Sequence, residues 1–211
     1  MAPSHKSHDK YCLITVGATV GFRELTASSL DARFWEALVK HGFTHLRVQC
    51  GPDIDWASSR LDSLRSEIPS SLSIEVFEIR KNLLKEEMML CKGDPAEREP
   101  GLVICHAGTG TILDGWRLGI SLVVVPNTSL LDDHQTEMAV HLAKQGYATS
   151  SSSKLEDLIE SLSKAEQLIE KNKSRWPAHD VPAQEATPAL RLWQISPDEV
   201  QREQDEQMNH D

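Results

Sequence analysis

The segment from Leu102 to Thr111 constrains the fold of this chain more than any other. Its apolar residues end in the small-residue turn His106-Ala107-Gly108-Thr109-Gly110-Thr111, and a helical pattern starts within that turn. This pattern predicts a buried strand that stops at a tight glycine loop, which opens directly into a helix. Such a junction offers unpaired backbone N–H groups and the positive end of a helix dipole, and both favour a phosphate group.

Strand and helix patterns alternate along the rest of the chain. We expect strands at 11–16, 44–49, 73–77, 102–105 and 122–125, and helices at 30–41, 54–65, 83–90, 110–118, 132–145 and 155–169. The alternation predicts an α/β fold, a Rossmann-like parallel sheet with helices on both faces. Because ligands of such folds bind beyond the carboxyl ends of the strands, the loops 17–21, 106–111 and 126–135 should share one rim.

Three helix starts carry a side-chain signal. Ser28 with Asp31 has the spacing of a capping box. Ser153 with Glu156 repeats that spacing before the last helical pattern. Asp53-Ile54-Asp55 has the spacing of a metal-binding pair, but it lies in a different loop from the glycine turn, and we interpret it as a helix cap. We therefore expect neither a metal ion nor a cofactor.

Composition limits the classes of partner. The chain has 211 residues with 39% apolar and 26% charged residues, enough for one filled domain with an extension. Its net charge is −10, and residues 177–211 supply −6 of it through eight acids and two arginines. An acidic chain without a basic stripe argues against binding to nucleic acid and against direct docking on anionic lipid.

Cysteine usage and hydropathy bear on location. The four cysteines are widely spaced and form no CxxC pair, which is typical of reduced thiols in the cytosol. No run approaches the roughly 20 apolar residues of a membrane span, and the polar start does not resemble a signal peptide. We predict a flexible segment at 1–10, a Rossmann-like domain at 11–172 and an acidic tail at 173–211 that is disordered or dependent on a partner.

Polar side chains near the glycine turn suggest a ligand with a diphosphate and hydroxyl groups. Asp114 lies one turn into the helix, where its carboxylate can accept two hydroxyl hydrogen bonds from a ribose; a first-turn acid that complements the helix dipole would have the same position. Gln135 has the donors and the acceptor that suit vicinal hydroxyls of a sugar. His134 beside it is equally typical of an exposed surface.

His106 and the loop itself also allow plainer interpretations. At the strand end, His106 can donate to a phosphate, act as an acid or base, or simply bond to the backbone of the turn. The loop fits an ordinary strand-to-helix turn as well. No lysine follows its second glycine as in a P-loop, and Leu113 stands where a dinucleotide-binding loop has its third glycine.

Three motifs together resemble one known family. They are Gly17-Ala18-Thr19-Val20-Gly21-Phe22, then His106 to Thr111, then Asp133-His134-Gln135 with Glu137, Leu142, Gly146 and Tyr147. Over residues 11–170 the chain resembles the soluble, donor-binding subunits of two-subunit eukaryotic UDP-N-acetylglucosamine transferases. These enzymes add the second N-acetylglucosamine (GlcNAc) to dolichyl-diphosphate-GlcNAc. The resemblance implies the C-terminal half of a GT-B glycosyltransferase.

The resemblance also implies roles for individual residues. Gly108, Thr109, Gly110 and Thr111 would hold the diphosphate of UDP-GlcNAc, Asp114 the ribose and Gln135 the GlcNAc hydroxyls. Five further residues would line the same cleft: Gly17, Thr19, His106, Asn127 and His134. His106 is the one candidate for a catalytic group, and the catalytic base can equally lie on the partner.

The implied partner is a membrane-anchored, acceptor-binding subunit. The pair would form a heterodimer at the cytosolic face of the endoplasmic reticulum, with this chain peripheral and otherwise cytoplasmic. In the family a C-terminal helix helps to bind the partner, and the apolar stripe of 155–169 is the best candidate here. Two alternatives stay open: a UDP-sugar-binding scaffold or regulator of a membrane protein, without chemistry of its own, and an unrelated Rossmann-like nucleotide protein.

Overall fold

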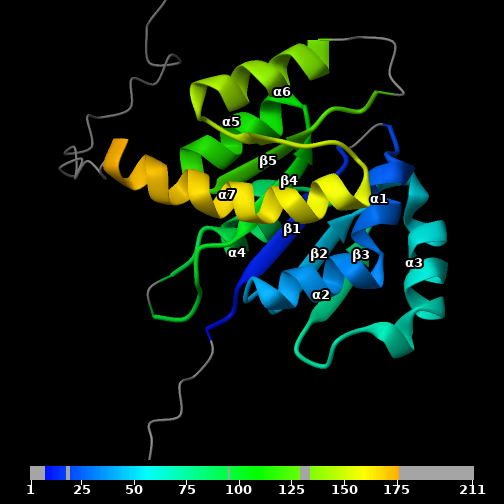
Figure 1. The fold of residues 1–211 in the computed structure, drawn as a ribbon. Coiled ribbons are helices and arrows are strands. Elements are labelled where there is room, and N and C mark those ends of the chain that lie inside the picture. The colour runs from blue at the N-terminus through cyan, green and yellow to red at the C-terminus, as the bar shows by residue number, and fades with distance from the viewer. Residues whose placement is uncertain (1–7, 18–19, 95, 129–133, 176–211) are drawn as a thin grey trace, which may run out of the picture. The chain divides into compact units, whose positions relative to one another are not determined.

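Parallel strands build the centre of the molecule. The computed structural model describes residues 8–17, 20–94, 96–128 and 134–175, and within them six strands form one sheet in the order β3-β2-β1-β4-β5-β6 (Figure 1). The strands are β1 (Tyr11–Thr15), β2 (His45–Gln49), β3 (Ser73–Phe77), β4 (Leu102–His106), β5 (Ser121–Val125) and β6 (Thr149–Ser150). Five of them confirm the predicted strands to within one residue at each end. The sixth has only two residues, too few for a sequence pattern.

Helices cover both faces of this sheet, as predicted. One face carries α1 (Arg23–Ser29), α2 (Ala32–Lys40), α3 (Ile54–Ser63) and α7 (Leu155–Arg175), and α7 and α2 lie in front of the sheet in Figure 1. The other face carries α4 (Met89–Cys91), α5 (Thr109–Leu118) and α6 (His134–Gln145). Short 3-10 helices occur at η1 (Gly51–Asp53) and η2 (Arg65–Glu67), and a π-helix at η3 (Leu84–Met88).

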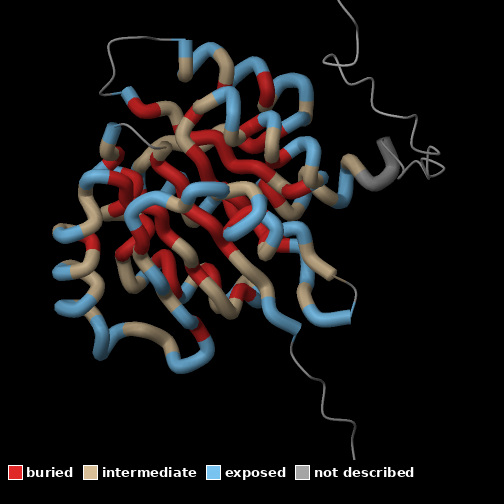
Figure 2. The backbone as a smooth tube through the Cα atoms, turned by 180° about the vertical axis from the view of Figure 1, so that it is seen from behind, coloured by how far each residue is buried: buried red, intermediate tan, exposed pale blue. Residues whose placement is uncertain are grey.

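Strands β1, β4 and β5 are buried from both sides, and their side chains alternate between two cores. Ile14 of β1 lies opposite Val48 of β2 and Ile104 of β4, and all three belong to the core under α1, α2 and α7. The neighbouring residues Leu13 and Val103 point to the other core, under α4, α5 and α6. The buried path of these strands is visible in Figure 2. This double burial explains why the strands read as continuous apolar runs.

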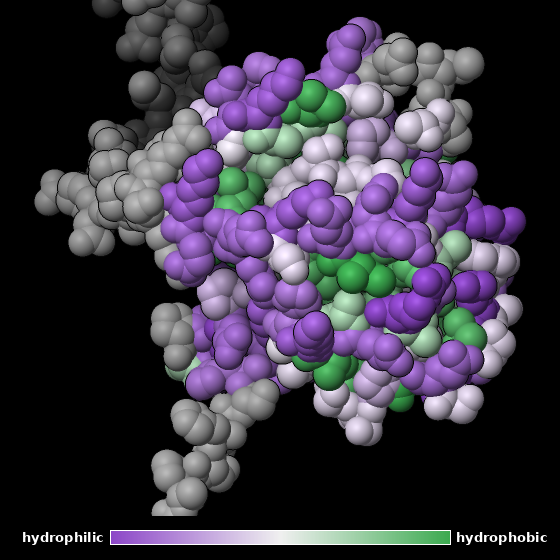
Figure 3. Space-filling view, in the orientation of Figure 1, coloured by the Kyte–Doolittle hydropathy of each residue, from purple (hydrophilic) through white to green (hydrophobic). Residues whose placement is uncertain are grey.

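The apolar stripe of α7 is largely buried inside the domain. Leu155, Leu158, Leu162 and Ala165 are buried in the core with the strands. Figure 3 shows hydrophilic side chains over the outer surface of α7, with smaller hydrophobic areas beside it. These four residues contact the sheet, so the expectation that the helix of 155–169 binds a partner subunit stays a prediction for its other residues. None of the helices in the described part of the chain combines the length and the apolar character that a membrane span needs.

The predicted capping box of Ser28 and Asp31 does not form. An unpredicted helix, α1, already contains Ser28, because Leu25 and Leu30 are fully buried and hold this segment against the core. Asp31 alone caps α2, and its carboxylate accepts a hydrogen bond from the backbone N–H of Arg33 at 2.9 Å.

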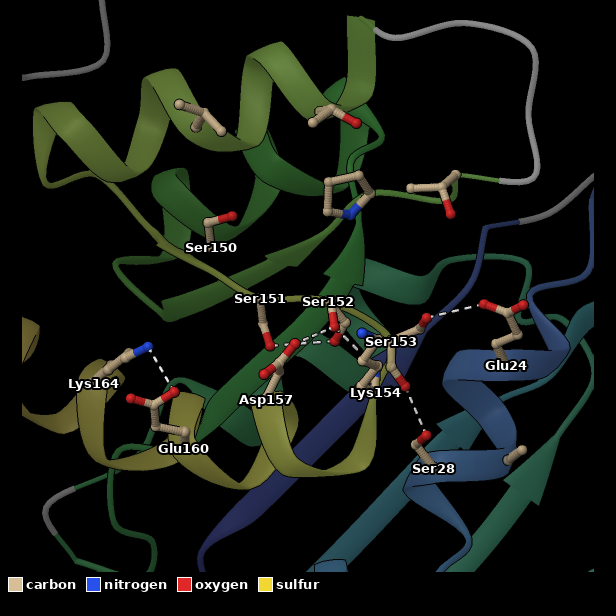
Figure 4. Close-up of a pocket in the computed structure, with 15 residues that line it drawn as sticks. Glu24, Ser28, Ser150, Ser151, Ser152, Ser153, Lys154, Asp157, Glu160 and Lys164 are labelled. Atoms are coloured by element: carbon tan, nitrogen blue, oxygen red, sulfur yellow. Dashed lines mark hydrogen bonds and ion pairs between the residues drawn. The ribbon is translucent and has the colours of Figure 1, made fainter.

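The second predicted box, that of Ser153, is replaced in the same way. Ser152 accepts the N–H of Lys154 at 3.1 Å, whereas the Ser153 hydroxyl donates to Glu24 of α1 at 3.0 Å (Figure 4). Ser28 donates to the Ser153 carbonyl at 2.7 Å. Both serines therefore connect α1 to the segment before α7 and do not cap a helix locally.

A buried acid stabilises the turn of η3, where the sequence predicts an ordinary helix. The side chain of Glu87 is 2% exposed and pairs with Arg47 of β2 and with Arg80, whose Nε lies 3.0 Å away. A buried carboxylate is tolerated only when it is paired in this way. The ion pairs therefore fasten η3 to the sheet.

The acidic tail expected at 173–211 lies almost wholly outside the described residues, and its behaviour stays a prediction.

Candidate functional site

The strand order reverses between β1 and β4. The chain leaves β1 for helices on one face of the sheet and leaves β4 for α5 on the other, so the loops after these two strands diverge. In open α/β sheets this switch point is where a crevice for ligands forms, at the carboxyl ends of the strands. The loops that were predicted to share a rim follow β1, β4 and β5, which are adjacent, so that prediction is confirmed for their described residues.

Contacts around His106 join the first two loops. A Cβ atom added to Gly17 would lie 2.8 Å from Cε1 of His106, and one added to Gly108 would lie 2.3 Å from its Nε2. The imidazole therefore occupies the space between two glycines from different loops. Gly17 also has a φ of +89°, a conformation that residues with a side chain rarely adopt.

The environment of His106 favours the neutral ring. Burial lowers the pKa of His106, and the nearby Thr15 backbone opposes that shift without reversing it. Its Nδ1 atom is buried and has no hydrogen-bond partner among the described residues. The adjacent Cys105 is unsuited to act as a nucleophile, because burial raises the pKa of its thiol to about 12.

The first turn of α5 presents its backbone N–H groups at this edge. Gly108 is the N-cap, and no side chain in the described ranges caps the helix. Thr109 and Gly110 are exposed, and Thr111 is half-buried. With the dipole of α5 behind them, these N–H groups form an anion-binding geometry of the kind that holds phosphates.

The loop after β5 is hydrogen-bonded to the loop after β1 and to the start of α6. Asn127 is 4% exposed, and its side-chain nitrogen lies 3.5 Å from the Gly21 carbonyl in the loop after β1. Its backbone N–H donates to Oε1 of Gln135 at 3.1 Å. Gln135 is thereby held at the start of α6 by the strand-end loop, as a side chain that is to read a sugar would need to be.

The other predicted residues are more loosely placed. Asp114 is about a third exposed on α5, and its carboxylate pairs at 3.3 Å with Arg117, three positions farther along the same helix. His134 is 80% exposed and lies 3.9 Å from Glu137. Thr19 lies outside the described residues, as does the Asp133 of the third motif. The binding roles of all these residues stay predictions.

Asp53 has a different role from the one predicted. Its side chain makes no capping hydrogen bond to α3. Its Oδ2 instead lies only 2.4 Å from the position that a Cβ of Gly21 would take. Its Oδ1 lies 3.4 Å from Nε of Arg23. Asp53 thus fastens the loop after β2 to the loop after β1, and it lines a cavity of about 490 Å³ together with Asn127. Only the glycine at position 21 hinted at this close approach.

A second cavity lies farther along the same edge. It encloses about 950 Å³ between α1, α6 and the serine-rich segment before α7 (Figure 4). Pro126, Thr128 and Thr136 line it, so it adjoins the stretch that carries Asn127 and Gln135. Within the described ranges, no group of three or more His, Cys, Asp or Glu side chains is placed to hold a metal ion.

Comparison with known proteins identifies relatives of this chain. It is 31% identical over 156 residues to the UDP-N-acetylglucosamine transferase subunit ALG13 of Saccharomyces cerevisiae, covering 67% of this chain and 77% of the relative. It is 34% identical over 177 residues to the subunit of the same name from Cryptococcus neoformans, covering 73% of this chain and 82% of the relative.

Solved structures agree with the fold. An NMR solution structure of ALG13 matches with a TM-score of 0.57 and 27% identity, over 76% of this chain and 87% of that chain. The crystal structure of MurG from Acinetobacter baumannii matches in fold with a TM-score of 0.52 and 24% identity, over 76% of this chain and 43% of that one. The sheet and its helices therefore correspond to the C-terminal half of a GT-B glycosyltransferase. A model of the glycosyltransferase family 28 C-terminal domain matches residues 11–189, and the chain belongs to that family.

Proposed function

We propose that this chain is the donor-binding subunit of a transferase that moves GlcNAc from UDP-GlcNAc onto dolichyl-diphosphate-GlcNAc. The observation that carries the proposal is the uncapped first turn of α5 at the switch point between β1 and β4. The names of the relatives support UDP-GlcNAc as the donor. The product is the lipid-linked chitobiose of N-glycan precursor synthesis.

The donor lies along the carboxyl edge of the sheet. The N–H groups of Thr109, Gly110 and Thr111 hold the diphosphate. Asp114 releases its ion pair with Arg117 and accepts hydroxyl hydrogen bonds from the ribose. Gln135, held by the Asn127 backbone, donates to the GlcNAc hydroxyls. Gly17, Thr19 and His134 complete the walls of the cleft.

The reaction is a displacement at the anomeric carbon. A hydroxyl oxygen of the acceptor sugar forms a bond to that carbon, the bond from the carbon to the β-phosphate oxygen breaks, and its electron pair leaves with UDP. Negative charge therefore grows on the diphosphate, where the N-terminus of α5 stabilises it. The acceptor proton passes to a base on the partner subunit, because the nitrogens of His106 face buried and glycine-lined space.

The partner supplies the acceptor site and the membrane anchor. We infer a heterodimer at the cytosolic face of the endoplasmic reticulum, with this chain peripheral. Because the stripe of α7 is buried, the docking surface on α7 lies near its end, where Leu168 and Ile169 line a groove of about 440 Å³ with Trp116 and Tyr147.

The test is GlcNAc transfer to a lipid-diphosphate GlcNAc acceptor in membranes depleted of this chain, with and without the purified chain added back. Restored formation of the two-sugar lipid supports the proposal. A folded, membrane-recruited chain that restores nothing would leave the non-catalytic UDP-sugar-binding scaffold as the better account. Equal affinity of the complex for UDP and UDP-GlcNAc would instead indicate an unrelated nucleotide-binding role.

A further inference from the structure

The backbone conformation at position 108 does not require a glycine. Its φ of −87° and ψ of 123° are ordinary values for any residue. The space that a Cβ would take is filled by His106, with Nε2 at 2.3 Å, Cε1 at 2.8 Å and Cδ2 at 3.2 Å. At Gly110, two residues farther along, a Cβ would meet no described atom within 4 Å apart from its chain neighbours and the backbone of its own helix.

We propose that the His106 ring and Gly108 form a lock that sets the position of the first turn of α5. In this lock His106 is a positioning residue and not a catalytic one. The glycine is present so that the ring fits, whereas in glycine-rich phosphate loops a glycine commonly serves the close approach of the ligand. The proposal assigns His106 an effect on the donor that is transmitted through Gly108.

The geometry connects the ring to the helix in two steps. Gly108 donates its N–H to the His106 carbonyl at 2.7 Å, and its own carbonyl accepts the N–H of Ile112 at 3.2 Å. The start of α5 is therefore bonded to the residue whose ring lies against it. A displaced ring would move Gly108 and, with it, the N–H groups of the next three residues.

The ring also lies against the loop after β1. A Cβ on Gly17 would meet Cε1 at 2.8 Å and Nε2 at 2.9 Å, so the same ring edge touches both loops at the switch point. Nδ1 is buried without a partner among the described residues. The half-buried imidazole thus sets the distance between two loops, and its buried Nδ1 is poorly placed to exchange protons with a substrate.

The experiment is a double-mutant cycle of Gly108→Ala and His106→Ala in the full chain, read by thermal unfolding. We expect Gly108→Ala to lower the Tm by about 5 °C when His106 is present, because the added methyl overpacks the ring. In the His106→Ala background the same change should cost less than about 2 °C. The preference of an N-cap for glycine over alanine acts in both backgrounds and cancels. Gly110→Ala is the matched thermal control, and its Tm should not fall.

A second readout uses the complex with its membrane partner and rests on the proposed function. Gly108→Ala should raise the KM for UDP-GlcNAc about tenfold with little change in kcat, and His106→Ala should remove most of that rise. His106→Ala alone should lower kcat by less than about tenfold, whereas the loss of an acid or base costs 100-fold or more.

Equal thermal costs of Gly108→Ala in both backgrounds would overturn the lock, as would a kcat loss of 100-fold for His106→Ala. If the wild-type complex transfers no GlcNAc, the proposed function fails by itself. The thermal cycle still decides the lock in that case, because it needs no ligand.

Discussion

The N-termini of α2 and α5 are built from the same backbone groups but are finished differently. Asp31 closes α2 with a carboxylate that accepts a backbone N–H, and Arg33 lies 3.4 Å from the same oxygen. The helix α5 starts at Gly108, and no described side chain caps it. An N-terminus closed by an acid contributes to stability, whereas one left open can accept a foreign anion. The difference teaches that the open N-terminus at the switch point between β1 and β4 is available to an anion, whereas the closed N-terminus of α2 is not.

Giving α5 the acid that α2 has should break the comparison most strongly. Thr109→Asp places a carboxylate at the exposed first position of the helix, where it repels a diphosphate and complements the dipole. We expect the affinity of the complex for UDP-GlcNAc to fall about 100-fold while the Tm stays equal or rises. Calorimetric titration and thermal unfolding measure the two effects. Thr109→Asn is the neutral control, and an affinity within threefold of wild type for Thr109→Asp would contradict the assignment.

Removing the side-chain amide of Gln135, which we propose to bind the sugar, should have the next largest effect. Gln135→Ala leaves the diphosphate contacts intact and deletes the hydrogen bonds to GlcNAc. The affinity for UDP-GlcNAc should therefore fall about tenfold, with the affinity for UDP changed less than twofold. Competition binding with the two ligands on the same variant separates these outcomes. Parallel losses for both ligands would place Gln135 away from the sugar.

Opening α2 should sharpen the comparison from the other side. Asp31→Ala removes the cap, and we expect the free energy of unfolding to fall by about 1 kcal/mol. Urea denaturation measures this loss, and Asp31→Asn, which keeps the acceptor, should retain most of the stability. Donor binding should not change, because α2 covers the face of the sheet and takes no part in the α5 turn. A loss of UDP-GlcNAc affinity would show that the two N-termini are coupled.

The smallest expected effect concerns the ring beneath α5. Burial lowers the pKa of His106 from its ordinary value of 6.5. As the pH falls through 6.5 the unfolded chain therefore takes up a proton that the folded chain does not, and stability is lost until the folded pKa is reached. Denaturation midpoints between pH 7 and pH 5 should fall more steeply for wild type than for His106→Asn. Identical slopes would mean that the ring titrates normally.

Much of the fold could be predicted because the signals are local. The runs at β1, β4 and β5 are largely apolar, and Gly17, Gly108 and Pro126 follow them within two residues. Patterns of about five residues can be recognised without knowing which segments pack beside them. The strand-end loops followed from the parallel sheet, and the motif of His106 to Thr111 identified the candidate site before any geometry was known.

Other features were set by contacts between distant segments. Ser28 and Ser153 have the local spacing of caps, yet each found a better partner across 125 residues or more of chain. Asp53 likewise pairs with Arg23 instead of capping α3. Sequence spacing predicts only hydrogen bonds between residues within one turn, so it could not predict these long-range pairs.

The sequence by itself determined the class of the fold, the positions of its main strands along the chain and the loop that opens into α5, because hydrophobic periodicity and glycine act within a few residues. Only the tertiary structure decided that β6 completes the sheet, that the stripe of α7 is buried, and that the His106 ring lies between Gly17 and Gly108. Each of these features depends on which surfaces pack together in the folded domain. That outcome follows from the packing of segments far apart in the chain, and no short stretch of residues encodes it alone.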